Sequence, residues 1–192
     1  MSLSSSPVSP PPLALPTVIV LASGRGERFI ASGGHTHKLQ ALLAGKPVLQ
    51  HTLDAVIASG LPWHLEDAGH PGMGDSIAAA VRATPDATGW LVLPGDLPLV
   101  RSDTLRAVAR ALAQHAVVIP LYQGARGHPV GFAAACRDGL LGLTGNQGAA
   151  PVVRAQEAMN SVAVLALDDV GIVTDVDTVD DLARAEALLA AR

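Results

Sequence analysis

The chain is poor in the residues on which several classes of protein depend. Cys136 is its only cysteine in 192 residues, which excludes an intramolecular disulfide framework and fits a reducing cytoplasm. No apolar run approaches the roughly 18–20 residues that span a bilayer, so we expect no membrane partner. The formal net charge is −4 and basic residues form no run, which argues against a nucleic-acid partner.

The first sixteen residues differ in composition from the rest. The segment MSLSSSPVSPPPLALP is rich in serine and proline and contains no charged side chain. Such a segment cannot bury enough apolar surface to offset the entropy lost on ordering. We therefore predict a disordered tail over 1–16 and a single domain over 17–192.

Apolar runs alternate with helical patterns along that domain. Thr17–Ala22, Trp90–Leu93 and Ala116–Ile119 are typical of buried strands, while Lys46–Ser59 and Val179–Ala191 show helical spacing. The further predicted elements are a brief strand around Trp63–Leu65, helices over Gly74–Arg82, Ser102–Gln114 (capped by Ser102 or Asp103), Val130–Leu141 and Ala149–Met159, and strands near Ser161–Leu167 and Gly171–Thr174. This alternation predicts an α/β fold with three α/β/α layers and a mostly parallel sheet.

Two unusual loops follow predicted strands. LASGRGERFIASGGHTHKL leaves the first strand with glycines, two arginines and Lys38, and Pro94-Gly-Asp-Leu-Pro98 leaves another. Ligands of such sheets bind beyond the carboxyl ends of the strands, and glycine backbone N–H groups suit phosphate oxygens. The loop is not a P-loop, because Pro47 follows Gly45-Lys46, and Phe29 stands where a dinucleotide fingerprint requires its third glycine.

Five motifs in order resemble one known family. They are LASGRGERF (21–29) with Lys38-Leu and Gly45-Lys-Pro-Val-Leu, Gly72-Met-Gly-Asp-Ser76, Leu93-Pro-Gly-Asp-Leu-Pro98, Gly127-His-Pro-Val-Gly-Phe132, and Val173-Thr-Asp-Val-Asp-Thr178 with Asp180-Asp-Leu182. The set resembles the molybdenum-cofactor nucleotidyltransferases, especially their cytidylyltransferase branch. The resemblance implies a Rossmann-like nucleotidyltransferase fold.

The resemblance also implies a reaction. A phosphate oxygen of the acceptor attacks the α-phosphate of a nucleoside triphosphate, CTP being favoured, and pyrophosphate leaves. Both reactants are anions, so charge neutralisation and positioning carry most of the catalysis. The implied acceptor is a phosphorylated pterin, molybdopterin or its molybdenum-loaded form, the implied cofactor is Mg²⁺, and a molybdoenzyme is an implied contact.

Site residues follow from the same match. The catalytic residues would be Arg28, Lys38 and Asp96. The nucleotide-binding residues would be Leu21, Ala22, Ser23, Gly24, Gly26, Gly74 and Ser76. Asp96 with Asp177 or Asp175 would hold the metal, and His128, Pro129 and Asn146 would lie on the acceptor side.

Several of these residues also have plain structural interpretations. Gly24 and Gly26 suit a tight turn, and Asp175 or Asp177 could cap the last helix. His35 and His37, lacking a third ligand, are typical of solvated loop residues rather than of a metal site.

Three segments depart from the family pattern. Only Leu61–Pro71 separates the first helix from Gly72, which predicts a reduced second strand–helix unit. Because that unit helps to frame the nucleobase in the family, the identity of the base stays undecided. The loop before Lys38 is long. The acceptor block G-D-x-G-A-R reads Gly145–Ala150 here, with asparagine for the acid and alanine for the arginine. Guanylyl transfer, a sugar-phosphate acceptor, and a non-catalytic nucleotide- or pterin-binding accessory protein of a molybdoenzyme are therefore alternatives.

Overall fold

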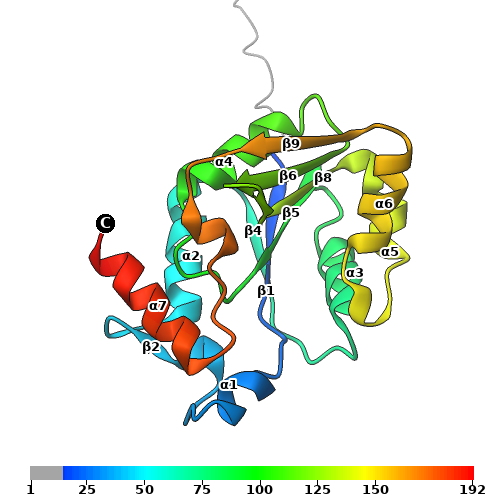
Figure 1. The fold of residues 1–192 in the computed structure, drawn as a ribbon. Helices are drawn as coiled ribbons and strands as arrows, with labels where there is room; N and C mark the ends of the chain where they lie inside the picture. Colours follow the sequence, from blue (N-terminus) through cyan, green and yellow to red (C-terminus); the bar gives the residue numbers. More distant parts are fainter. Residues whose placement is uncertain (1–14) are drawn as a thin grey trace, which may run out of the picture.

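A seven-stranded mixed sheet forms the centre of the molecule (Figure 1). The computed structural model describes residues 15–192, so the predicted tail lies almost wholly outside the described residues. The strand order is β4-β1-β5-β8-β6-β7, and β9 pairs with β6. The strands are β1 (Thr17–Leu21), β4 (Trp63–Glu66), β5 (Gly89–Pro94), β6 (Val117–Tyr122), β7 (Ala125–Arg126), β8 (Val130–Ala133) and β9 (Val162–Ala166).

The sheet is mostly parallel, as predicted. β1 runs parallel to both β4 and β5, and β9 runs parallel to β6. β8 is antiparallel to its neighbours β5 and β6. The β-branched run Val18-Ile-Val20 is fully buried, because helices cover both faces of the strand that it forms.

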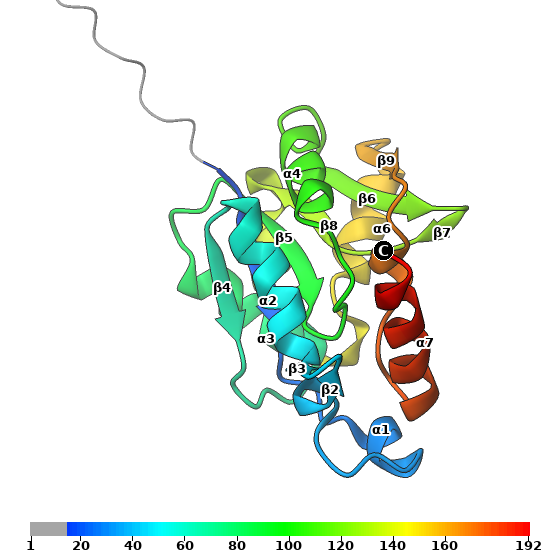
Figure 2. The same ribbon diagram turned by 90° about the vertical axis from the view of Figure 1, so that its left-hand side faces the viewer.

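Helices lie on both sides of this sheet (Figures 1 and 2). They are α1 (Glu27–Ala31), α2 (Val48–Ser59), α3 (Met73–Ala83), α4 (Ser102–Ala111), α5 (Arg137–Leu141), α6 (Ala150–Ala158) and α7 (Val179–Ala190). α3, α5 and α6 pack with Ile19 on one face, whereas α2 and α4 pack with Val18 and Val20 on the other. Successive side chains of β1 therefore pack into two separate hydrophobic cores, one on each face of the sheet. Among the described residues, no helix is both long and apolar enough to cross a membrane.

A third apolar cluster lies beyond the end of the sheet. It joins Phe29 of α1, Leu39 of the 3₁₀ helix η1 (Lys38–Gln40), Leu43 of the hairpin β2 (Leu42–Leu43)–β3 (Lys46–Pro47), and Ala185 of α7. The backbone N–H of Val179 donates to Ser32 Oγ at 3.0 Å, so α7 begins beside the end of α1. This cluster fixes the long loop that carries Lys38.

Two predicted elements were wrong. Val130–Ala133, predicted as the start of a helix, is strand β8, because it pairs with β5 and β6 and a side chain at Gly131 would collide with Val108. Gly171–Thr174, predicted as a strand, lies instead in the 3₁₀ helix η4 (Val170–Val173) and in Thr174, the residue that follows it. The Asp169 carboxylate caps η4 by accepting from Gly171 N–H.

Helix ends also differ from the sequence-based expectation. α4 is preceded by Arg101, without a side-chain cap from Ser102 or Asp103, and ends at Ala111. Thr178 caps α7 in a reciprocal capping box with Asp181. The two candidate metal carboxylates upstream of Thr178 are therefore free of a capping role.

The strand–helix unit after α2 is short, as predicted. Only the four-residue β4 stands between α2 and α3, and β4 ends the strand order on that side. The prediction of a brief strand at Trp63 is confirmed.

Candidate functional site

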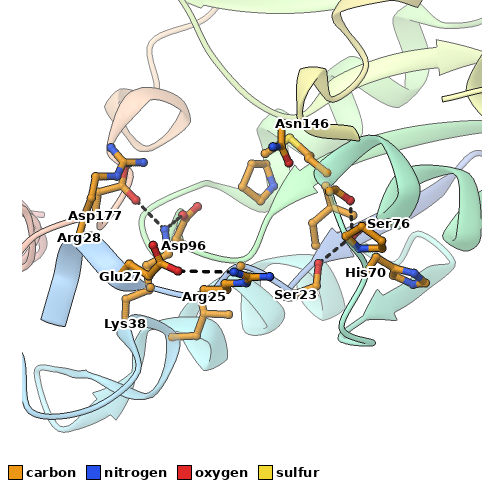
Figure 3. A pocket seen from close by; sticks show the side chains of 18 residues that line it. Ser23, Arg25, Glu27, Arg28, Lys38, His70, Ser76, Asp96, Asn146 and Asp177 are labelled. Atoms are coloured by element: carbon orange, nitrogen blue, oxygen red, sulfur yellow. Dashed lines mark hydrogen bonds and ion pairs between the residues drawn. The ribbon is translucent and has the colours of Figure 1, made fainter. Parts of the chain in front are cut away.

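The two unusual loops meet at one cavity of about 500 Å³ at the carboxyl ends of β1 and β5 (Figure 3). Ser23, Gly24 and Gly26 line it from the glycine loop, and Asp96 lines it from the loop after β5. The structure therefore confirms that both loops lie together at the carboxyl ends of the parallel strands, where such sheets bind ligands. Further lining residues come from η1, from the segment before α3, and from Asp177.

Lys38 lies between two carboxylates at one end of this cavity. Its Nζ is 2.5 Å from Asp96 Oδ2 and 2.6 Å from Asp177 Oδ1, and all three side chains are at most 16% exposed. The exposed Arg28 pairs with the other Asp177 oxygen at 2.8 Å. Burial alone would lower the pKa of Lys38, but the two carboxylates outweigh it and raise that pKa, so the ammonium is charged.

His37 positions Lys38 and the glycine loop together. Its Nδ1 accepts from Leu39 N–H at 3.3 Å and so caps η1. Its Nε2 therefore carries the proton and donates to the Gly24 carbonyl at 2.6 Å. His37 is a partly exposed loop residue, and the structure adds that both of its ring nitrogens make hydrogen bonds, whereas His35 is exposed. Sequence spacing gave no signal of this contact.

The structure separates the two candidate second carboxylates. Asp177 lines the cavity, whereas Asp175 is exposed and lines neither cavity of the site. Although the residue is exposed, partial desolvation of its carboxyl and the nearby carboxylates of Asp177 and Asp96 raise the pKa of Asp175. Val176 N–H donates to the Asp96 carbonyl at 3.0 Å, and this backbone bond brings Asp177 to its place opposite Asp96.

The Asp96–Asp177 pair fits a divalent cation. Asp96 Oδ1 is buried and has no hydrogen-bond partner among the described residues, so it is an oxygen that a cation could use. Within residues 15–192 no group of three or more His, Cys, Asp and Glu side chains is arranged to hold a metal. Magnesium at phosphate-transfer sites takes one or two carboxylates and completes its shell with phosphate oxygens and water, which matches this pair.

Serines connect the glycine loop to α3 at the other end of the cavity. Ser23 Oγ lies 2.8 Å from Ser76 Oγ, and Ser76 Oγ donates to the Gly72 carbonyl at 3.2 Å. Gly26 takes a left-handed conformation (φ 67°) immediately before α1, which glycine adopts without strain. Gly74 does not line the cavity; a side chain there would strike the Thr144 carbonyl.

The other predicted nucleotide and acceptor residues divide between two cavities. A second cavity of about 440 Å³ adjoins the first, and both are lined by Leu21, Met73 and Pro94. Asn146 lines the first cavity and His128 the second. Neither lining includes Ala22 or Pro129.

His128 is the buried polar group of the second cavity. Burial lowers the pKa of its imidazole, and Nδ1 has no hydrogen-bond partner among the described residues. The remaining walls are mostly apolar, from Ile77, Val92 and Phe132. The cavity suits a ligand with an apolar body and a few polar groups.

Sequence reasoning assigned no role to three ionisable residues that line the first cavity. Arg25 lies in the glycine loop, Glu27 is the first residue of α1, and His70 precedes α3. The position of Arg25 between two loop glycines was a usable signal; His70 lies in the segment that departs from the family pattern and offered none.

A comparison with family models adds a match to this geometry. Residues 54–162, more than half of the chain, match the model of the MobA-like NTP transferase domain. The chain belongs to this family. The description of the family names transfer from a nucleoside triphosphate.

Curated relatives of this chain are distant. The bifunctional protein GlmU of Xylella fastidiosa is 31% identical over 133 residues, which are 56% of this chain and 28% of the relative. GlmU of Desulfitobacterium hafniense is 26% identical over 166 residues, 74% of this chain and 36% of the relative. The chain thus spans about a third of the length of the curated relatives that it matches.

Solved structures share the fold over nearly the whole of this chain. Rv0371c of Mycobacterium tuberculosis is 26% identical with a TM-score of 0.69, covering 90% of this chain and 98% of its own; that protein has also been solved in complex with manganese. A nucleotidyl transferase of Methanothermobacter is 18% identical with a TM-score of 0.76, covering 93% and 99%. Molybdopterin-guanine dinucleotide biosynthesis protein A of Archaeoglobus fulgidus is 18% identical with a TM-score of 0.60, covering 92% and 100%.

Proposed function

We propose that this NTP transferase moves a nucleoside monophosphate from CTP to a phosphorylated acceptor, molybdopterin or its molybdenum-loaded form, and releases pyrophosphate. The observation that carries the proposal is the Lys38 ammonium held between Asp96 and Asp177 opposite the glycine loop. A cation and two carboxylates at one cavity end suit a triphosphate together with its metal ion.

The residues of the first cavity would act mainly by neutralising and orienting charge. Backbone N–H groups around Gly24 and the side chains of Arg25 and Arg28 would hold the β- and γ-phosphates. Lys38 would stabilise the charge that grows on the α-phosphate. No general base is needed, because a phosphate monoester, with a second pKa near about 6, is already an anionic nucleophile at neutral pH.

Asp96 and Asp177 would hold the divalent ion, Mg²⁺ in our proposal. When bound, this ion would neutralise part of the charge on the triphosphate and so make its α-phosphate easier to attack. The manganese complex of Rv0371c supports divalent-metal use among proteins of this fold. Lys38 would then exchange its two carboxylate partners for phosphate oxygens.

The second cavity would receive the acceptor. It adjoins the first at Leu21, Met73 and Pro94, so a ligand there can reach the α-phosphate of a nucleotide in the first cavity. Its apolar walls suit the flat rings of a pterin. Asn146 and Ala150 replace an acid and an arginine of the family pattern, so a sugar phosphate is the rival acceptor.

We further propose that the reaction takes place in the cytoplasm, where the buried thiol of Cys136 would stay reduced, and that the product passes to a molybdoenzyme. A non-catalytic accessory role is the alternative of another class. The Lys38–Asp96–Asp177 arrangement disfavours it, because nucleotide binding alone has little use for a buried lysine between two carboxylates.

The test is pyrophosphate release from CTP, GTP, ATP or UTP with Mg²⁺ and purified molybdenum cofactor. We expect release with CTP, loss of at least a hundredfold in Asp96→Asn, and unchanged release in the matched control Asp86→Asn, whose carboxylate is exposed outside the cavity. Binding of nucleotide without release from any of the four would contradict the transferase proposal and support the accessory role.

A further inference from the structure

The sequence departs most from its family just before α3, and there a buried carboxylate lies between two histidines. Glu66, the last residue of β4, is 6% exposed. Its Oε1 accepts from Ala68 N–H at 3.2 Å and lies 3.1 Å from His70 Nε2, and its Oε2 lies 3.6 Å from His64 Nε2. A buried carboxylate is costly unless such donors satisfy it, so the surrounding donors hold Glu66 in one orientation.

Glu66 in turn fixes the proton on the His70 ring. A carboxylate has no proton to donate, so the 3.1 Å contact requires the proton on His70 Nε2. In the neutral imidazole the other nitrogen, Nδ1, is then a hydrogen-bond acceptor. A carboxylate that fixes a histidine tautomer is a known way of tuning a neighbouring site.

His70 lines the first cavity away from its cationic end. Figure 3 shows His70 beside Ser23 and Ser76, with Arg28 and Asp177 at the opposite side of the view. A triphosphate is drawn to the end with Arg28 and Lys38. A nucleotide that extends along the cavity therefore brings its base toward His70.

We infer that His70, oriented by Glu66, selects a base that carries an amino group on its pairing edge. An acceptor at Nδ1 pairs with the N4 amino group of cytosine, whereas it faces the O4 acceptor of uracil. The inference rests on the proposed function, since it places a nucleotide in the first cavity. It makes CTP the preferred pyrimidine nucleotide through a contact from the segment where the strand–helix unit is shortest.

The experiment measures dissociation constants of CTP and UTP by calorimetry with Mg²⁺ and no acceptor. We expect the unmodified protein to bind CTP more tightly by on the order of tenfold, the worth of one hydrogen bond against a mispaired acceptor. His70→Ala should weaken CTP and leave UTP nearly unchanged, so that the two constants converge.

Two further variants make the test sharper. In Glu66→Gln the proton of His70 is no longer fixed on Nε2, because an amide can donate as well as accept a hydrogen bond. This variant should show a smaller preference for CTP, while CTP and UTP still bind. His64→Ala is the matched control: His64 lies near the same carboxylate but does not line the cavity, so it should keep the full preference. Thermal unfolding of each variant identifies any loss of fold.

Two outcomes would overturn the inference: a CTP preference that survives His70→Ala in a folded protein, or tighter binding of UTP by the unmodified chain. Neither would refute nucleotidyl transfer itself, which depends on pyrophosphate release, although tighter binding of UTP would count against CTP as the donor. Conversely, a CTP preference that depends on His70, without release toward any acceptor, would sustain base selection and refute the transfer reaction.

Discussion

Replacing Lys38 by methionine should lower the free energy of unfolding, because it removes the positive charge that lies between two carboxylates. The substitution leaves Asp96 and Asp177 facing each other with only the exposed Arg28 nearby. Removing one partner of a buried ion pair costs about 3–5 kcal/mol; because these side chains are 12–16% exposed and Arg28 remains, we expect about 2–3 kcal/mol. For a chain of this size that is a fall of about 4–12 °C in the unfolding midpoint.

The pH dependence of that difference follows from the raised pKa of Lys38. A raised lysine pKa contributes stability that is fully present below the ordinary value of 10.5 and is lost as pH rises through the folded value. The gap between the two proteins should therefore be constant from about pH 7 to 10 and close above it. Mn²⁺ should narrow the gap by occupying the place of the ammonium between the carboxylates.

Thermal unfolding followed by circular dichroism, at several pH values and with or without Mn²⁺, measures all three effects. Lys46→Met is the control, because Lys46 pairs with Asp54 at the surface with both side chains more than 40% exposed; it should cost at most about 1 kcal/mol. Equal stability of Lys38→Met and the unmodified protein at pH 7 would refute the reasoning.

Other predictions concern neighbouring residues. Asp177→Asn should lower pyrophosphate release at least a hundredfold and weaken Mn²⁺ binding, whereas Asp175→Asn should change neither; equal effects would contradict the assignment of the metal. His37→Ala should raise the Kd for CTP severalfold while His35→Ala does not, measured by calorimetry. Burial lowers the pKa of His128, so the protein should lose stability as pH falls below the ordinary value of 6.5; His128→Phe should flatten that dependence in thermal melts.

The sequence was most informative where local pattern and burial agree. The apolar run at Thr17–Leu21 forms strand β1, which lies between β4 and β5. Gly60 ends α2 in the left-handed conformation that often closes a helix. Val130–Ala133 was misjudged because its apolar residues fit a helix as well as a strand. Its place between β5 and β6 is decided by pairing with segments far away in the chain.

In the candidate site, too, local pattern predicted some residues correctly, whereas contacts between distant segments decided the others. The glycine loop and Asp96 could be placed at one sheet edge because each follows a buried strand. Asp175 and Asp177 could not be separated, since the choice depends on the backbone bond from Val176 to Asp96. His70 was missed because its ring is oriented by the buried carboxylate of Glu66. A four-residue edge strand gives no reason to expect such a buried carboxylate.

The backbone bond from Val176 to the Asp96 carbonyl also sets the order in which the site can be completed during synthesis. A domain generally folds as one unit, and here Asp177 follows Lys38 by 139 residues. The α7 residue Ala185, which belongs to one apolar cluster with Phe29 and Leu39, comes later still. A nascent chain would therefore have no complete pair of carboxylates around its lysine until this segment had been synthesised and had packed onto the rest of the fold.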